Sequence, residues 1–319
     1  MLLIHHWDTD GICSAAIIIK ESGRNIDNMT PLIGNYFLTE GEKEKCSKYD
    51  EICIADIALP EDDIIFLSKR ADVTVFDHHL CKYIERIRHV NPVSLGKKQE
   101  DFPSTTWVLR EYFRREVDLL TVLGIVGDNE HQIKRNRRFM EIIKKFCMRE
   151  KISFDDLLRS CHLIDSNYKL NRREDVEKIP WMMLDMSVND ILEHEIWNRN
   201  LSILEKEIAD IISNEDGKEM RRGTIVVNIN TKYNIISTVT RRIAWATDKD
   251  TVVVNRGMED IDQVYVRSSK MDLSKLIDSL VKDGYRAGGK SNVAGIVVKK
   301  EDTDKIVETI LNFLGGDQW

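Results

Sequence analysis

The chain has 319 residues, of which 42% are hydrophobic and 32% are charged, and its formal net charge is −7. This length accommodates two domains of ordinary size, each with enough apolar residues to bury a core. The acidic balance argues against a protein that coats duplex DNA through a large basic face, and no apolar run reaches the roughly 18 residues of a membrane-spanning helix.

The N-terminus and the cysteines bear on where the protein works. The chain starts with a strand-like segment that no basic region precedes, so we expect no secretory signal. The cysteines form no CxxC pair and follow no regular spacing: Cys13, Cys46, Cys53, Cys81, Cys147 and Cys161. This pattern favours reduced, buried thiols in a cytoplasmic protein over a disulfide framework or a zinc site.

A short apolar run, residues 2–4, leads into three possible metal ligands, His6, Asp8 and Asp10. Side chains two residues apart in an extended segment point the same way, so we expect the three to converge where a first strand ends. Gly11 then permits a tight turn, and residues 12–20 are expected to form the first helix. Open α/β sheets bind ligands at the carboxyl ends of their strands. An Asp-rich surface turn is the alternative.

Two further apolar segments predict strands that end in a similar way. Residues 52–57 do not alternate, which is typical of a strand buried on both faces of a parallel sheet, and Asp56 lies near their end. The β-branched and aromatic segment 73–76 predicts a third strand, which is followed by Asp77, His78 and His79. Three expected strands thus end on possible metal ligands at one edge of a sheet.

The segments between and after these strands are mostly expected to be helical. Residues 40–50 are charged and irregular, but residues 60–70 begin with Pro and acids, as helices do. Ser104 is expected to cap a helix that reaches about Phe113. Residues 119–127 form either a helix or a strand, and in both cases they deliver Asp128.

Residues 134 to about 215 are expected to be mostly helical, with a break at Pro180. Their first part carries basic residues that only Glu141 opposes before Glu150: Lys134, Arg135, Arg137, Arg138, Lys144, Lys145 and Arg149. This run forms either a local basic groove or an ordinary solvated helix face. Residues 188–214 place apolar side chains three and four positions apart, which predicts one long connecting helix or a surface helix with one buried stripe.

The polar segment 214–218, with its glycine, marks the best domain boundary. Beyond it the pattern predicts strands at 224–227, 251–254, 262–267 and 293–298, and helices at 235–246, 273–281 and 302–313. We therefore expect an α/β protein in three parts: a parallel-sheet catalytic domain at residues 1–185, a helical connector at 186–216 and a smaller α/β domain at 217–319.

The expected metal ligands are His6, Asp8, Asp10, Asp56, His78 and Asp128. Four carboxylates and two imidazoles are more than one ion needs, so we expect two divalent ions. Such mixed oxygen and nitrogen donors suit Mn²⁺ first, with Mg²⁺ or Co²⁺ as alternatives. Structural Zn²⁺ prefers cysteine and histidine.

Two ions about 3.5–4 Å apart form the arrangement that supports displacement at phosphorus, because they activate a shared water and neutralise phosphate oxygens. Asp56 is expected to bridge the two ions, since its strand lies between the other two groups. Asp77 is expected to fix His78 in place, and His79 is expected to reach a phosphate oxygen. The catalytic residues are therefore expected to be Asp56, Asp77, His78 and His79.

Four segments, in order, resemble the four motifs of the DHH phosphoesterase superfamily: His6-x-Asp8-x-Asp10-Gly11, the lone Asp56, Asp77-His78-His79 and Gly127-Asp128. This resemblance covers residues 1–128 and implies a DHH catalytic domain. Trp7, inside the first motif, is more similar to archaeal RecJ-like proteins than to bacterial ones.

The C-terminal part resembles the DHHA1-type substrate-binding domain of RecJ-like nucleases and nanoRNases. The resemblance lies in Val266-Arg267-Ser268-Ser269 and in Gly288-Gly289-Lys290-x-x-x-Ala294-Gly295. It implies that Arg267, Gly288, Gly289 and Lys290 bind substrate together with His79, because backbone amides of glycine-rich segments cradle phosphates. The family usually has a histidine where this chain has Lys290, which supplies a point charge in place of an imidazole.

The resemblance implies a Mn²⁺-dependent phosphodiesterase that hydrolyses single-stranded DNA or RNA from an end, in a cleft between the two domains. One alternative is a nanoRNase-like enzyme or a phosphodiesterase for dinucleotides or cyclic dinucleotides. Pyrophosphatases of the superfamily lack the Arg267 and Gly288-Gly289 pattern. A replication-complex scaffold is the alternative outside catalysis, and a replication or repair protein remains open as a partner.

Overall fold

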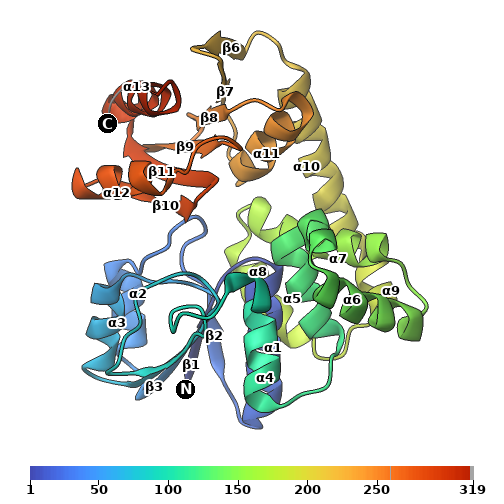
Figure 1. The fold of residues 1–319 in the computed structure, drawn as a ribbon. Coiled ribbons are helices and arrows are strands. Elements are labelled where there is room, and N and C mark those ends of the chain that lie inside the picture. Colours follow the sequence, from blue (N-terminus) through green and yellow to red (C-terminus); the bar gives the residue numbers. More distant parts are fainter. Residues whose placement is uncertain (259, 317–319) are drawn as a thin grey trace. The chain divides into compact units, whose positions relative to one another are not determined.

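The computed structural model describes residues 1–258 and 260–316, so the last three residues of the expected C-terminal domain lie outside the description. The chain divides into two compact units, Met1–Leu201 and Ser202–Trp319, each of which is considered by itself (Figure 1). Within the described residues, no helix combines the length and the apolar character that crossing a membrane requires.

The first unit is built on a five-stranded sheet in the order β2-β1-β3-β4-β5. The strands are β1 (Leu2–His5), β2 (Asp27–Met29), β3 (Glu51–Ala55), β4 (Asp72–Phe76) and β5 (Arg88–Val90). Every pair of neighbours is parallel, so all carboxyl ends meet at one edge. The parallel sheet that the apolar runs predict is therefore confirmed, with two short strands, β2 and β5, that the sequence pattern did not indicate.

Helices follow the strands and then continue alone. They are α1 (Thr9–Ser22), α2 (Glu40–Cys46), α3 (Glu61–Ser68), α4 (Thr105–Phe113), α5 (Leu119–Asn129), α6 (Arg137–Glu150), α7 (Phe154–Lys169), α8 (Arg173–Met182), α9 (Val188–Leu192) and α10 (Glu195–Ser213). Short 3-10 turns lie at Gln99–Asp101 and Glu130–Arg135. The helix expected at 60–70 and the one capped by Ser104 are both confirmed.

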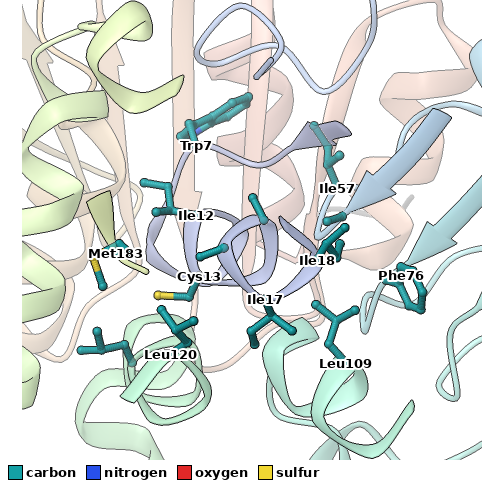
Figure 2. Packing of buried hydrophobic residues seen from close by; sticks show 14 of the residues in the cluster. Trp7, Ile12, Cys13, Ile17, Ile18, Ile57, Phe76, Leu109, Leu120 and Met183 are labelled. Atoms are coloured by element: carbon teal, nitrogen blue, oxygen red, sulfur yellow. The ribbon is translucent and has the colours of Figure 1, made fainter. Parts of the chain in front are cut away.

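Helix α1 lies at the centre of this unit. Its residues 9–19 are all buried, as expected for a helix that is enclosed on every side. It packs on β1 and on α4, α5 and α8. Figure 2 shows Cys13 and Ile17 facing Leu120 of α5 and Leu109 of α4. Because full burial of one such side chain contributes about 1.5–3 kcal/mol, α1 holds the sheet and the helical layer together.

Two sequence expectations in this unit are wrong. Residues 40–46 are not irregular: Thr39 and Glu42 form a capping box that starts α2. Such a box stabilises a helix that has no apolar stripe. Pro180 does not interrupt the helix, because it lies inside α8, near its C-terminal end. It removes only one backbone hydrogen bond, the one to the carbonyl four residues earlier. The segment 119–127, for which the sequence allowed a helix or a strand, is the helix α5, capped by Asp118.

The connector is also not one continuous helix. It consists of α9 and α10, separated at Glu193 and His194. Asn198 stabilises this break, because its side-chain amide donates to the carbonyls of Leu192 and His194 at 2.8 and 3.1 Å. The apolar stripe that predicted the helix is present in α10, where Trp197 and Leu204 are buried.

The second unit contains a six-stranded sheet in the order β10-β11-β9-β8-β7-β6. Its strands are β6 (Lys218–Arg221), β7 (Thr224–Ile229), β8 (Thr251–Asn255), β9 (Ile261–Arg267), β10 (Arg286–Lys290) and β11 (Val293–Lys299), and its helices are α11 (Ile236–Thr247), α12 (Ser274–Lys282) and α13 (Thr303–Leu314). All pairings are antiparallel except β7 with β8. The expected smaller α/β unit is thus confirmed.

Helices cover the sheet of the second unit, and its central strand β8 is buried along its whole length. Alternate residues of β9 and β11, such as Val264, Val266 and Ile296, pack with α12 and α13. Helix α11 packs on β8 and β9. The segment Gly288-Gly289-Lys290 belongs to the edge strand β10, which pairs with β11.

Candidate active site

Three strands of the first unit end directly at expected site residues. His6 follows the last residue of β1, Asp56 follows β3, and Asp77 follows β4. The backbone of Asp56 has a φ of 62°, which is rare for a residue other than glycine. Its N–H still donates to the carbonyl of Phe76 at 2.9 Å. This turn of the chain directs a buried carboxylate across the carboxyl edge of the sheet.

Asp8 and Asp10 reach the same region by a different route from the one expected. Strand β1 ends at His5, so strand alternation does not align His6 with the two aspartates. Asp8 instead caps α1, with Oδ1 accepting from the N–H of Gly11 at 3.0 Å, and its Oδ2 lies 2.9 Å from Nδ1 of His6. A Cβ on Gly11 would overlap the His6 backbone, so the turn requires glycine.

Asp10 is buried in the first turn of α1 and faces the beginning of α4. Its two oxygens accept from the N–H groups of Thr105 at 2.7 Å and Thr106 at 3.1 Å. A helix N-terminus favours negative charge there. The Thr105 hydroxyl donates to Oδ1 of Asp56 at 2.7 Å. The sequence pattern indicates the cap of α4 but not this role of Thr105, which only the packing of α4 against the sheet produces.

His78 is oriented as a metal ligand would be. Its Nδ1 lies 3.1 Å from the carbonyl of Phe102, and because a carbonyl only accepts, Nδ1 carries the proton. Nε2 then presents its lone pair toward Oδ2 of Asp128 at 3.4 Å and Oδ1 of Asp56 at 3.7 Å. Asp128 comes from the last turn of α5, not from a strand. A hydrogen bond to the far nitrogen is the usual support of a ligating imidazole.

Asp77 holds His79 and not the ring of His78. Its Oδ1 accepts from the backbone N–H groups of His78 at 2.8 Å and His79 at 3.2 Å, and from the ring Nδ1 of His79 at 2.7 Å. The expectation that Asp77 fixes His78 therefore holds only for its backbone. Burial raises the pKa of Asp77, but the charge and hydrogen bonds of His79 and His78 lower it more, so the carboxylate stays ionised.

The donor atoms form two groups that share one carboxylate. His6, Asp8 and Asp56 make one group, and Asp56, His78 and His79 make the other; within each, one ligand atom per residue lies within 4.8 Å of the others. Asp56 thus belongs to both groups, as the prediction of a shared ligand requires.

The charges of these groups fit divalent cations. Burial, followed by the negative charges of Asp128 and Asp8, raises the pKa of Asp10 to about 7. Burial and the same crowding of carboxylates place the pKa of Asp56 well above its usual range. Nε2 of His6 is buried and makes no hydrogen bond within residues 1–258 and 260–316. Oxygen-rich donors of this kind match Mn²⁺ or Mg²⁺ better than Zn²⁺.

A residue far along the chain secures the turn between Asp8 and Asp10. Asp165 of α7 is partly buried and accepts from the backbone N–H of Thr9 at 2.9 Å and from its hydroxyl at 2.7 Å. Lys169 lies 3.6 Å from the other oxygen of Asp165. No sequence motif marks Asp165, because its role depends on a contact across 156 positions of the chain.

An aromatic surface borders the two donor groups. The ring of Tyr36 lies 5.8 Å from that of His6 with an interplanar angle of 28°, and 5.2 Å from the ring of Trp7. Trp7 is buried, whereas Tyr36 is 58% exposed. Tyr36 was not among the expected site residues, although it lies in the loop after β2, next to the carboxyl edge of the sheet.

The expected substrate-binding residues of the second unit lie on neighbouring strands. Arg267 ends β9, and the pairing register aligns it through Val293 with Lys290 of β10, so these side chains share one face of the sheet. The guanidinium of Arg267 lies 5.3 Å from the ring of Trp245, a half-exposed residue of α11.

The two glycines of β10 differ in what they tolerate. Gly289 has a φ of 155°, and a Cβ there would overlap the carbonyl oxygen of Val293. The backbone conformation and the close approach of Val293 are therefore sufficient to require glycine at position 289. Gly288 has open space where a Cβ would lie, so nothing in the fold itself demands glycine at that position.

Comparisons with known proteins place this architecture. No family model matches the sequence, and no curated protein resembles it closely enough to count as a match. Among solved structures, RecJ of Thermus thermophilus in complex with Mn²⁺ superposes with a TM-score of 0.68 at 16% identity, over 98% of this chain and 51% of RecJ. The chain therefore spans about half the length of that relative.

Two other structures are similar over most of both chains. The DHH domain of a member of a family of ribosomal proteins has a TM-score of 0.72 at 15% identity, over 99% of this chain and 86% of its own. A pGpG-specific phosphodiesterase from Vibrio cholerae has a TM-score of 0.53 at 12% identity, over 99% of both chains.

The fold is that of the DHH phosphoesterase superfamily. This chain shares that fold with RecJ and with the DHH domain, and it has both a parallel sheet and a separate mixed sheet. The family resemblance carried by the four sequence motifs thus predicted the fold correctly.

Replacing Asp56 with Asn tests the shared ligand. Asn is nearly isosteric and tolerates the left-handed backbone of this position, so the fold should survive while the bridging negative charge is lost. We expect Mn²⁺ affinity to fall by more than about 100-fold, measured by calorimetric titration. Asp62→Asn, at an exposed position of α3, should bind Mn²⁺ normally. Wild-type affinity in Asp56→Asn would refute the bridge.

A substitution at Gly124 of α5 tests how tightly the residues around Asp10 are packed. A Cβ there would overlap the Asp10 carboxylate and the Thr106 side chain. Gly124→Ala should therefore destabilise the fold by about 1–3 kcal/mol and weaken Mn²⁺ binding, both measured by thermal melting with and without the metal. Gly41→Ala is the control, because a Cβ in α2 meets nothing within 4 Å. Equal behaviour of the two variants would contradict the packing argument.

The raised pKa values predict that Mn²⁺ displaces protons. With a pKa of about 7, Asp10 is largely protonated below that pH, and metal binding requires the carboxylate form. Apparent affinity should rise as pH increases from 6 toward 8, and more protons should be released at pH 6 than at pH 8. Calorimetry in buffers of different ionisation enthalpy measures this release, and pH-independent binding would show that Asp10 is ionised without metal.

Proposed function

We propose that the protein is a metal-dependent phosphodiesterase that degrades single-stranded nucleic acid, DNA or RNA, from an end. Two divalent ions serve as cofactors, with Mn²⁺ the preferred metal and Mg²⁺ or Co²⁺ as substitutes. The observation that carries the proposal is the pair of donor groups that share Asp56 at the carboxyl edge of the sheet. The free cysteines, most of them buried, support a reducing, cytoplasmic setting.

The proposed ligands divide between two ions. His6, Asp8 and Asp56 would hold the first, and Asp56, His78 and Asp128 the second, with the buried Asp10 completing the set. Bound ions would lower the pKa of a water molecule and neutralise charge on the phosphate oxygens. Thr105 and Phe102 keep Asp56 and His78 in place through hydrogen bonds at 2.7 and 3.1 Å.

His79 is proposed to act on the substrate. Asp77 accepts a hydrogen bond from Nδ1 of His79 at 2.7 Å, which orients the ring and directs Nε2 to a phosphate oxygen. The side chain of His79 is 30% exposed, whereas His78 is buried. This difference supports a division of roles in which His78 binds metal and His79 meets the substrate.

A nucleic-acid substrate is supported by aromatic and basic surfaces in both units. The exposed ring of Tyr36, next to His6, offers a face on which a base can stack. In the second unit, Arg267 and Lys290 supply positive charge and Gly288 leaves backbone accessible, so we propose that these residues and Gly289 bind the substrate phosphates. This assigns the segment 217–319 as a substrate-binding domain, 1–185 as the catalytic domain and 186–216 as their connector.

A short substrate is the second candidate. The similar Vibrio cholerae enzyme is specific for pGpG, so a nanoRNase-like activity, or one on dinucleotides or cyclic dinucleotides, is the alternative. A scaffold in a replication or repair complex would need no metal, and the convergence of four carboxylates on one buried region makes this the weaker alternative.

One assay separates these functions. The protein is incubated with Mn²⁺ and with one of three substrates: end-labelled single-stranded DNA, end-labelled single-stranded RNA or pGpG. Parallel reactions contain Mg²⁺, Co²⁺ or a chelator, and the Asp56→Asn variant is the negative control. We expect products that shorten progressively from one end of the long substrates. Cleavage of pGpG alone would favour the short-substrate alternative. If the protein cleaves none of these substrates in the presence of metal, the proposed phosphodiesterase activity is refuted.

Variants in β9 and β10 test the substrate-binding proposal. Arg267→Ala and Lys290→Ala should raise KM for single-stranded DNA by about tenfold or more, with unchanged Mn²⁺ affinity, because charged phosphate contacts contribute about 1.5–3 kcal/mol. Gly288→Ala should act in the same direction without destabilising the fold. Equal loss of metal affinity in these variants would show that the two units do not divide binding and catalysis as proposed.

A further inference from the structure

A groove lies on the surface of the first unit between α6 and the start of α7. Its volume is about 460 Å³, and its apolar lining consists of Met140, Ile143, Cys147, Met148, Ile152 and Phe154. None of the residues of the candidate active site lines it. The proposed reaction therefore gives no reason for its existence.

Met148 is the clearest sign that this groove is a contact surface. It is 73% exposed, whereas Ile143, which also lines the groove, is fully buried beneath it. A flexible thioether beside a half-buried Phe154 forms a surface that adapts to apolar side chains of a partner. Exposed apolar surface that borders a groove commonly marks an interaction site.

The rim of the groove is positively charged. Lys144 and Lys151 line it, and no ion pair of either lysine occurs in the described part of the chain. Lys134 places its ammonium 4.7 Å from the centre of the Phe154 ring. By contrast, two arginines of α6 form ion pairs. Arg137 lies 3.3 Å from Glu141, and Arg149 lies 2.8 Å from Glu150. Asp156, whose negative charge acts on Cys147 of the lining, opposes part of this charge. Lys134, Lys144 and Lys151 outnumber it, so the rim is positive in a protein whose net charge is −7.

We propose that the groove binds a short acidic, amphipathic helix of a partner protein. Apolar residues of that helix, spaced three and four apart, enter the groove around Met148. Its Asp or Glu residues face Lys144 and Lys151, and this charge complementarity orients the helix. Lys144, one residue of the basic run that the sequence left open between a groove and a solvated face, thereby acquires a specific role.

The lining favours a peptide over nucleic acid. Single strands bind on exposed aromatic faces, where bases stack. This groove offers mainly aliphatic and thioether side chains, and its one aromatic ring, Phe154, is already approached by Lys134 and by the ring of His131 at 5.8 Å. An apolar helix face fits such a surface, whereas a base does not.

Selection from a random peptide library tests the proposal on the full-length protein. Libraries of 16-residue peptides are selected in parallel against the wild type, Met148→Glu and Lys144→Glu. Lys97→Glu, at an exposed position outside the groove, is the charge-matched control. Enriched peptides are synthesised and titrated by fluorescence anisotropy, and thermal melting verifies that each variant is folded.

We expect the wild type to enrich peptides rich in Asp and Glu, with apolar residues at helical spacing and micromolar affinity. Met148→Glu and Lys144→Glu should each weaken binding at least about tenfold, as hot-spot substitutions do, whereas Lys97→Glu should leave it within about threefold. The proposal is overturned by no enrichment, by basic peptides, by binding that survives Met148→Glu, or by single-stranded oligonucleotides that compete at the groove.

Discussion

The main physical constraint on this structure is the repulsion among carboxylates that the fold brings close together. Asp10 and Asp56 are buried, and the partly exposed Asp8 and Asp128 lie close to them. Like charges repel strongly where little water screens them. Asp10 and Asp56 consequently have raised pKa values. A polypeptide tolerates this arrangement only if rigid elements hold the groups together or if cations bind among them. The parallel strands, the N-terminus of α4 and the caps of α1 provide the rigidity, and the donor set provides the place for cations.

Close packing around α1 is what holds these groups in register. Because α1 is buried along residues 9–19, each neighbouring helix must approach it closely. Gly11, Gly124 and Gly127 lie where a Cβ would press on His6, on Asp10 or on Thr9, so small residues on α1 and α5 set the spacing of the acidic residues. Asp165 adds a hydrogen-bonded anchor to Thr9 from α7. The helical layer thus shapes the site as much as the sheet does.

The net charge of −7 conceals an uneven distribution of charge. Four aspartates converge at the donor groups, whereas basic residues occur elsewhere: on α6 of the first unit and at Arg267 and Lys290 of the second. A metal-loaded acidic centre and separate basic surfaces are compatible with a polyanionic substrate. The two basic regions differ in kind, because the α6 groove is lined by aliphatic side chains and the face bearing Arg267 carries the aromatic Trp245.

Local sequence determined three of the five parallel strands, β1, β3 and β4, and where possible ligands follow them, because apolar runs, β-branching and capping act over a few residues. For that reason the linear sequence is enough to recognise His6, Asp56 and His78 as candidate ligands. Contacts between distant segments decided the rest. The bond from Thr105 to Asp56, the anchor of Asp165 on Thr9 and the helical origin of Asp128 all depend on how α4, α5 and α7 pack. Such packing leaves no periodic signal in the chain, since each contact joins residues many positions apart and is specified only by the assembled core.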